Sequence, residues 1–245
     1  QHYSFEMDGV FFRELDLPAP HANLEVGSRS QAYQIAAILS GMEPILARER
    51  PDVLLVEGDT SSVLAAALTA NKLGVRVGHV EAGLRSYDRA MPEEINRILT
   101  DHLSDHLFAP TEHARTILLG EGIPAARVTV TGNTVVDELL LQRGRAERPE
   151  LYSRFDVQPG RVVLATVHRM ENVEHAGRLT GILKGLADTA RALDLPLLAA
   201  LHPRRQRCGL HGLEVRVPLA EGGRVGHAHR LVVLRAQHVA GGHRA

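Results

Sequence analysis

The residues best placed to do chemistry in this chain are two carboxylates, Asp59 and Glu81, which follow two consecutive apolar segments. Segments 53–56 and 75–80 are short, β-branched and flanked by glycine, which is typical of strands buried on both faces. Residues 61–73 between them are rich in alanine and leucine and have helical length. A strand, a crossover helix and a second strand make a parallel pair. We therefore expect both acids at one edge of a sheet, where open α/β folds bind ligands.

Helix capping is the simpler explanation for part of this pattern. Asp59 and Thr60 suit the N-terminus of the predicted helix, and we expect that role to be real. Capping does not account for Glu81, because Ala and Gly rather than a helical run follow it. Two acids at adjacent strand ends therefore predict an active site.

A third acid, Glu93, lies in the segment Met91–Leu99, whose early proline, acidic first turn and apolar spacing predict the start of a helix. The helix dipole alone also explains acids in a first turn. The loop 83–90 joins this helix to Glu81, so we expect Glu93 to reach the same crevice. Three carboxylates there suit proton transfer, because their mutual repulsion keeps one protonated while another acts as a base.

A possible phosphate contact comes from His168 and Arg169, which follow the predicted strand 162–167. A histidine at a strand end is commonly structural, but beside an arginine it is well placed to meet a phosphate. The 14 histidines also invite a metal site, and His102 and His106 have helical i, i+4 spacing. Because no His-Glu-x-x-His motif or third ligand accompanies them, we expect no metal.

Length and composition restrict the class of protein. With 245 residues and 44% hydrophobic content, the chain fits one large or two smaller globular domains. It has no apolar run long enough to span a membrane, and its formal charge of −1 without a basic stripe argues against a nucleic-acid partner. One cysteine, Cys208, excludes an internal disulfide and indicates the cytoplasm. The chain begins at Gln1 without a signal-peptide pattern, and we expect an upstream part to be missing.

Strands alternate with helices along most of the chain, and the predicted strands end in polar residues. This alternation predicts an α/β protein with Rossmann-like, doubly wound parallel sheets whose carboxyl edge is the working face. The run that ends in Gln158-Pro159-Gly160 has no apolar period and indicates a linker.

The final segment, 204–245, has an unusual composition. It uses only ten residue types, all with GC-rich codons, and shows no clear alternation of strands and helices. A normal domain of that size would contain several of the missing types. We expect a tail read out of frame from a GC-rich gene, and a natural low-complexity extension is the alternative.

From Gln1 to about Arg204, the chain resembles the non-hydrolysing UDP-N-acetylglucosamine 2-epimerases. The resemblance implies two Rossmann-like domains of the GT-B type with a UDP-sugar in the cleft between them. The motifs that carry it are Gln-His-Tyr, Gly-Asp-Thr, Gly-His-Val-Glu-Ala-Gly-Leu-Arg-Ser, Pro-Glu-Glu-Ile-Asn-Arg, Thr-Gly-Asn-Thr-Val-Val-Asp and the turns His168-Arg169 and His202-Pro203.

The resemblance implies an isomerase that removes the proton at carbon 2, expels UDP and adds UDP back after reprotonation on the other face, without a cofactor. Asp59, Glu81 and Glu93 match the family's acid and base carboxylates, and His168 matches the histidine that assists the diphosphate. It further implies a cytoplasmic homodimer in cell-envelope polysaccharide biosynthesis, with a second UDP-sugar as a candidate regulator. The implied substrate-binding residues are Gln1, His2, Arg85, Asn133, Arg169 and His202.

The chain departs from the family at both ends. The first strand with its Gly-Thr-Arg-Pro-Glu turn is absent, and so is the Ser-Gly-Gly segment that grips the nucleotide in the second domain. We therefore expect the chain to be poorly active, and two alternatives to an epimerase stay open: an impaired fragment with a partial nucleotide-sugar site, or a GT-B glycosyltransferase. The expected parts are a first domain over 1–142 without its first strand, a linker over 143–160, a partial second domain over 161–203 and an aberrant tail over 204–245.

Overall fold

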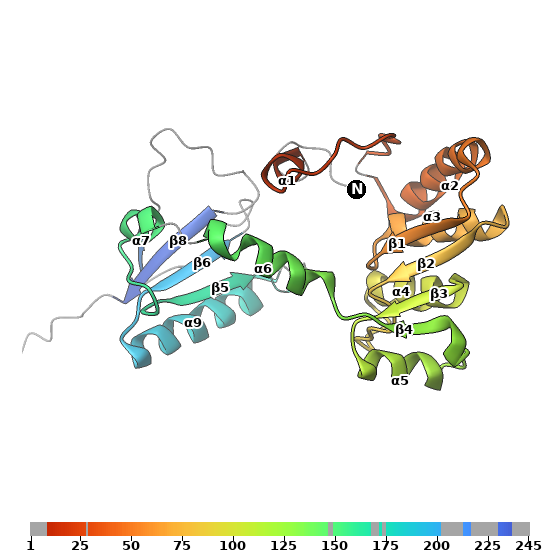
Figure 1. Ribbon diagram of the computed structural model, residues 1–245. Coiled ribbons are helices and arrows are strands. Elements are labelled where there is room, and N and C mark those ends of the chain that lie inside the picture. Colours follow the sequence, from red (N-terminus) through yellow and green to blue (C-terminus); the bar gives the residue numbers. More distant parts are fainter. Residues whose placement is uncertain are drawn as a thin grey trace, which may run out of the picture. The chain divides into compact units, whose positions relative to one another are not determined.

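The protein folds into two compact units, each of which is described here by itself (Figure 1). Unit 1 is Leu17–Arg143, and unit 2 comprises the described residues of 4–16 and 144–245. The computed structural model describes residues 9–27, 29–146, 149–167, 172, 175–201, 213–216 and 230–236.

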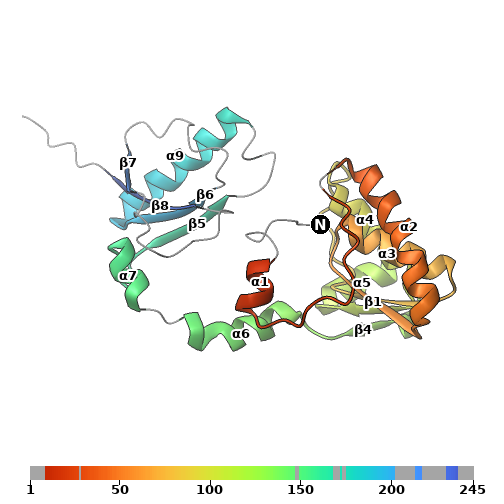
Figure 2. The same cartoon turned by 90° about the horizontal axis from the view of Figure 1, so that it is seen from above.

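Unit 1 is built on a four-stranded sheet of order β1-β2-β3-β4 in which all neighbours are parallel. Consecutive order with right-handed crossovers brings the connecting helices to one face of the sheet, as Figure 2 shows. Its elements are α2 (Gln31–Glu49), β1 (Val53–Glu57), α3 (Ser61–Lys72), β2 (Arg76–Val80), α4 (Pro92–Leu103), β3 (His106–Ala109), α5 (Glu112–Gly120), η1 (Ala125–Arg127) and β4 (Val128–Val130), and α6 (Thr134–Ala146) runs across its boundary.

The predicted strand, helix and strand around the two acids are confirmed as β1, α3 and β2. Thr60 is the N-cap of α3, and its hydroxyl accepts a hydrogen bond from the Val63 N–H. Val56 pairs with His79 and Glu57 with Val80, so the two strands end side by side. The turns that carry Asp59 and Glu81 are therefore neighbours.

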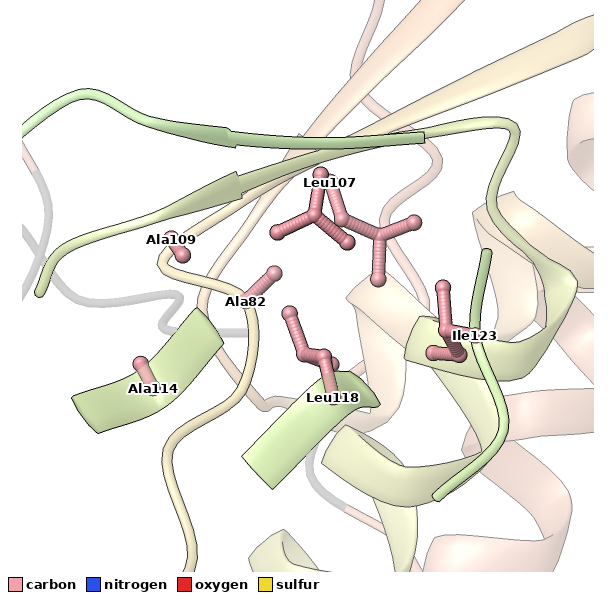
Figure 3. Packing of buried hydrophobic residues seen from close by; sticks show 7 residues of the cluster. Ala82, Leu107, Ala109, Ala114, Leu118 and Ile123 are labelled. Carbon is pink, nitrogen blue, oxygen red and sulfur yellow. The ribbon is translucent and has the colours of Figure 1, made fainter. Parts of the chain in front are cut away.

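A tight apolar cluster lies under the end of β2. It includes Ala82, directly after Glu81, and Leu107 of β3, both with no exposed surface (Figure 3). Small residues at several positions let helix α5 pack closely against the strands. The cluster consists of Ala82, Leu107, Ala109, Ala114, Leu118, Ile123 and Val128.

Unit 2 contains a second four-stranded sheet, of order β5-β6-β8-β7. Only β5 and β6 are parallel, whereas β8 runs antiparallel to both β6 and β7. Helix α9 buries Leu179, Leu183, Ala187 and Ala190, which share one face at helical spacing. The elements of unit 2 are α1 (Gly9–Glu14), α7 (Pro149–Phe155), β5 (Val163–Val167), α9 (Ala176–Leu193), β6 (Leu197–Leu201), β7 (Leu213–Arg216) and β8 (Arg230–Ala236).

Two segments contain elements that the sequence patterns did not indicate. The segment 143–160, predicted as a linker, contains the end of α6 and the whole of α7. Helix α7 starts with Pro149 and has Glu150 in its first turn, signals that start a short helix without an apolar period. The tail from 204 showed no clear alternation of strands and helices in sequence, and the structure places β7 and β8 within it, of which β8 is rich in leucine and valine. None of the described helices has the length and apolar character to cross a membrane.

Candidate active site

The turn after β1 presents Asp59 at the carboxyl edge of the sheet. Gly58 has a φ of 82°, which favours glycine, and its N–H donates to the Val80 carbonyl of the neighbouring strand (3.2 Å). Thr60 takes the capping role, so the carboxylate of Asp59 is available for other partners. The helix cap, Thr60, and the candidate functional acid, Asp59, are therefore different residues of this turn.

Helix α4 holds the Asp59 turn from the side. The Nε and a terminal nitrogen of Arg97 each lie 2.9 Å from Oδ2 of Asp59. The side-chain amide of Asn96 donates to the backbone carbonyl of Asp59 (2.9 Å). The Asp59 side chain nevertheless keeps 31% of its surface exposed. It is thus an oriented carboxylate that solvent or a ligand can reach.

The turn after β2 directs Glu81 toward the first turn. A Cβ added at Gly58 would lie 3.7 Å from Oε2 of Glu81, and the side-chain amide of Asn133 donates to its Oε1 (3.3 Å). Glu81 itself has a φ of 72°, in the left-handed region that favours glycine. The structure therefore brings Asp59 and Glu81 to adjacent positions at one edge, as the sequence predicted for this pair.

The rest of this turn has little freedom to move. The Ala82 N–H donates to the Phe108 carbonyl of β3 (3.1 Å). Gly83 has a φ of 83°, and a Cβ there would lie 2.6 Å from the Ala114 carbonyl oxygen of α5. A larger residue at position 83 would displace α5 or the turn. The close packing fixes the backbone beside Glu81.

Glu93, the third predicted acid, is exposed in the first turn of α4. It lies one helical turn before Arg97, so it belongs to the helix side that holds Asp59. Within the part of the chain that the structure describes, no hydrogen bond or ion pair joins Glu93 to Asp59 or Glu81. The convergence of three carboxylates stays a prediction.

The neighbouring acid, Glu94, ties the loop 83–90 to α4. Its side chain is 1% exposed and accepts hydrogen bonds from the N–H of Ser86 (2.8 Å), the hydroxyl of Ser86 (3.0 Å) and the N–H of Tyr87 (2.9 Å). Arg97 donates to it as well (2.6 Å). Burial opposes the charged form, but the hydrogen bonds and the Arg97 charge outweigh it, so the pKa of Glu94 lies below its ordinary value.

A buried charge network lies behind both turns. His79 and Asp101 have no exposed side-chain surface, and His79 Nδ1 lies 2.6 Å from Asp101 Oδ1. Asp101 Oδ2 contacts a terminal nitrogen of Arg85 (2.7 Å) and accepts from the N–H of Gly83 (3.2 Å). Arg85 also makes a two-bond contact with Glu121 (2.8 and 2.6 Å). The network therefore links β2, both turns and two helices.

Arg85 was expected to contact substrate, but its side chain is only 1% exposed, and its guanidinium lies against Asp101 and Glu121. Burial lowers its pKa, but the two carboxylates raise it more, so the pKa of Arg85 lies above its ordinary value. The structure therefore gives Arg85 partners within the protein.

A comparison with known families adds an independent observation. The family model described as UDP-N-acetylglucosamine 2-epimerase matches residues 1–219. The chain belongs to this family. The match extends beyond Arg204, where the motifs alone had suggested that the resemblance ends.

Relatives within the UDP-N-acetylglucosamine 2-epimerase family agree with this assignment. The enzyme of that name from Methanocaldococcus jannaschii is 47% identical over 210 residues, which cover 84% of this chain and 57% of the relative. A Pseudomonas aeruginosa protein named UDP-2,3-diacetamido-2,3-dideoxy-D-glucuronate 2-epimerase is 40% identical over 223 residues, which cover 89% of this chain and 61% of the relative. The chain thus spans about three-fifths of the length of these curated relatives.

A solved structure supports the same fold. The crystal structure of the M. jannaschii UDP-GlcNAc 2-epimerase in complex with UDP-GlcNAc and UDP has a TM-score of 0.73 and 45% identity, covering 84% of this chain and 57% of that one. The likeness confirms the predicted α/β fold of the GT-B type.

Several predicted site residues of this family member lie outside the described residues, namely Gln1, His2, His168, Arg169 and His202. In the described part of the chain, no group of three or more His, Cys, Asp or Glu side chains could hold a metal ion.

The sequence pattern assigned no role to five residues that hold the two turns: Glu94, Asn96, Arg97, His79 and Asp101. Glu94, Asn96 and Arg97 lie in the Pro-Glu-Glu-Ile-Asn-Arg motif of the epimerase family. The i, i+3 spacing of Glu94 and Arg97 is the signal that could have paired these two residues. His79 and Asp101 are 22 residues apart, and no local pattern connects them.

Proposed function

We propose that the protein is a UDP-N-acetylglucosamine 2-epimerase that interconverts UDP-N-acetylglucosamine and UDP-N-acetylmannosamine. The observation that carries the proposal is the pair Asp59 and Glu81 at the ends of neighbouring parallel strands, in a chain of this family. Epimerisation at carbon 2 requires a proton to leave one face of the sugar and another to arrive on the opposite face. Two carboxylates close together suit these two steps.

The proposed reaction proceeds through elimination and re-addition of UDP. One carboxylate accepts the carbon 2 proton while the bond from carbon 1 to the diphosphate oxygen breaks, which gives a 2-acetamidoglucal and free UDP. A proton then returns to carbon 2 from the other face, and UDP adds back to carbon 1. We assign the proton steps to Asp59, Glu81 and Glu93, and assistance of the departing diphosphate to His168, with Asn133 orienting Glu81.

Further parts of the proposal rest on the family resemblance. UDP-sugar contacts fall to Gln1, His2, Arg169 and His202, and a second UDP-sugar acts as a regulator. The protein works as a cytoplasmic homodimer in cell-envelope polysaccharide biosynthesis. The first domain includes residues 17–142, and the aberrant composition of 204–245 marks that segment as a tail.

The test is solvent exchange. The chain, extended with the remaining segments of the M. jannaschii relative, is incubated with UDP-N-acetylglucosamine in heavy water, and deuterium at carbon 2 is followed by NMR. We expect incorporation during turnover, and we expect Glu81→Gln and Asp59→Asn each to lower its rate by about 10²–10⁴-fold, the usual contribution of a general acid or base. Glu112→Gln, at an exposed acid of α5, is the control and should retain the rate.

The outcomes distinguish the alternatives. Epimerisation without deuterium incorporation would exclude the elimination mechanism. Transfer of the sugar to an acceptor without exchange would indicate a glycosyltransferase. An impaired fragment predicts that the 245-residue chain is inactive while a chimera extended with the remaining segments of the M. jannaschii relative is active. Comparable rates for both would contradict our interpretation of the tail.

A second substrate class has an observation in its favour. The P. aeruginosa relative is named for a diacetamido-glucuronate, and it is 40% identical to this chain. The same exchange assay with the UDP-linked uronate decides between the two sugars. Faster exchange with the uronate would replace the substrate in our proposal and leave its chemistry unchanged.

A further inference from the structure

His79 lies where three parts of unit 1 meet. It is the fourth residue of β2, and its side chain has no exposed surface. Its Nε2 lies 2.8 Å from the Gly58 carbonyl oxygen, in the turn that carries Asp59. Its Nδ1 lies 2.6 Å from Oδ1 of Asp101, on helix α4. One side chain thus connects the turn after β1 to the helix behind it.

The partners of His79 determine where its protons lie. A backbone carbonyl only accepts hydrogen bonds, so Nε2 must carry a proton. Asp101 accepts from Arg85 and from the Gly83 N–H through Oδ2, and its Oδ1 lies 2.6 Å from Nδ1. Both ring nitrogens of His79 are therefore held by fixed partners.

Charged groups continue the contacts of His79. Asp101 lies between His79 and Arg85, and Arg85 in turn contacts Glu121. The Arg85 guanidinium thus lies between two carboxyl groups along this chain of contacts. Buried charges persist in proteins when they are paired and hydrogen-bonded in this way.

We propose that His79 is a positioning residue for the two acids. Through Gly58 it holds the Asp59 turn, and through Asp101 and the Gly83 N–H it holds the turn that follows Glu81. Because His79 has no exposed surface, it acts on a substrate only through these turns. Its effect on catalysis rests on the proposed epimerase function, whereas its hydrogen bonds and its hold on the turns do not.

The first test measures ring protons in the intact 245-residue protein. Histidine is labelled with ¹⁵N, and long-range proton–nitrogen NMR spectra are recorded near neutral pH. His79→Gln identifies the signals of His79 by their disappearance. We expect Nε2 to show an attached proton, because its partner, the Gly58 carbonyl, only accepts. An Nε2 without a proton would overturn the contact by which His79 holds the Asp59 turn.

The second test follows the turns by hydrogen exchange. In His79→Gln, the amides of Gly58 and Gly83 should exchange at least about tenfold faster than in the wild type, a factor that corresponds to about 1.4 kcal/mol. Thr69→Val is the matched control, because Thr69 is also buried but bonds only within its own helix, to the Ala65 carbonyl. Equal exchange in the two variants would refute the positioning role.

The third test separates binding from chemistry in the carbon 2 exchange assay. We expect His79→Gln to lower kcat by about 100-fold, the effect of a displacement near 1 Å in a catalytic group, with KM unchanged. An increase in KM at unchanged kcat would contradict positioning of the acids. If the wild-type protein exchanges no deuterium, the proposed epimerase function has failed, and the first two tests still decide the role of His79.

Discussion

The two units contain the same strand-helix-strand arrangement, but they bury different kinds of residue. In unit 1, β1, α3 and β2 are accompanied by eight buried polar or charged residues, among them His79, Glu94 and Asp101. In the described part of unit 2, the buried residues around β5, α9 and β6 are all hydrophobic. Apolar packing is therefore sufficient to form this arrangement. Buried polar groups occur in unit 1, where the turns at the strand ends carry acids.

The largest expected difference between the units concerns their carboxylates. Asp101→Asn should lower the free energy of unfolding of unit 1 by about 3–5 kcal/mol, because the buried Arg85 cation and the buried His79 ring lose their shared carboxylate. Urea unfolding followed by hydrogen exchange of peptides from each unit measures the effect.

The control for that prediction is Asp188→Asn in unit 2. Asp188 contacts Lys184 (3.1 Å) and Arg191 on the exposed side of α9. Exposed ion pairs contribute little, so we expect no measurable change in unfolding. Equal effects of the two substitutions would contradict the contrast between the units.

Apolar cores should behave alike in both units. Leu107 of β3 and Leu197 of β6 have no exposed surface. Leu107→Ala and Leu197→Ala should each lower the free energy of unfolding of their own unit by roughly 2–5 kcal/mol, through lost burial and the remaining cavity. The same peptide-resolved exchange measures both. A loss that spreads equally to the other unit would show that the two do not unfold separately.

Lowering the pH should reduce the stability of unit 1 through the protonation of Glu94. Its pKa is lower in the folded protein, so the stability it contributes is fully present above its unfolded pKa and is lost as pH falls through its folded pKa. Glu94→Gln should cost about 1–3 kcal/mol near neutral pH, because Arg97 and the loop amides lose a charged acceptor. Urea unfolding at decreasing pH should show this difference shrink in acid. A constant difference would contradict the assignment.

The smallest expected effects come from two glycines with open space around them. Gly185 lies inside α9, and Gly185→Ala should stabilise unit 2 by about 0.5–1 kcal/mol. Gly74 in unit 1 has a φ of 73°, in the left-handed region. Gly74→Ala should therefore destabilise unit 1 by a similar amount, about 1 kcal/mol, although the added Cβ would contact no other atom. Thermal unfolding of each variant shows whether the substitution stabilises or destabilises its unit. Equal signs would show that backbone conformation does not decide the effect.

The sequence was sufficient to predict the parts of unit 1 that depend on local pattern. The strands β1 and β2 and the helix α3 follow from apolar runs and glycines, and parallel pairing then brings Asp59 and Glu81 to one edge. These inferences need only short-range periodicity and the handedness of the crossover. The family motifs then gave the chemistry.

The sequence was not sufficient where side chains meet across the fold. It drew attention to Glu93, whereas the buried carboxylate that fixes the loop is its neighbour Glu94. From the sequence we expected Arg85 to contact the substrate, because the sequence does not show that Asp101 and Glu121 lie against that residue. Such contacts depend on how helices pack on a sheet, which residue spacing alone does not determine. The antiparallel pairing of β7 and β8 was missed for the same reason.

The backbone at Glu81 has one more consequence. A residue other than glycine in the left-handed region costs of order 1–3 kcal/mol, and Glu81 has a φ of 72°. Glu81→Gly would relieve that strain and remove the acid in the same step. A laboratory selection for heat resistance alone should therefore favour glycine at position 81, whereas a selection for turnover should retain glutamate. The amino acid that natural variants carry there reports which of the two pressures has prevailed.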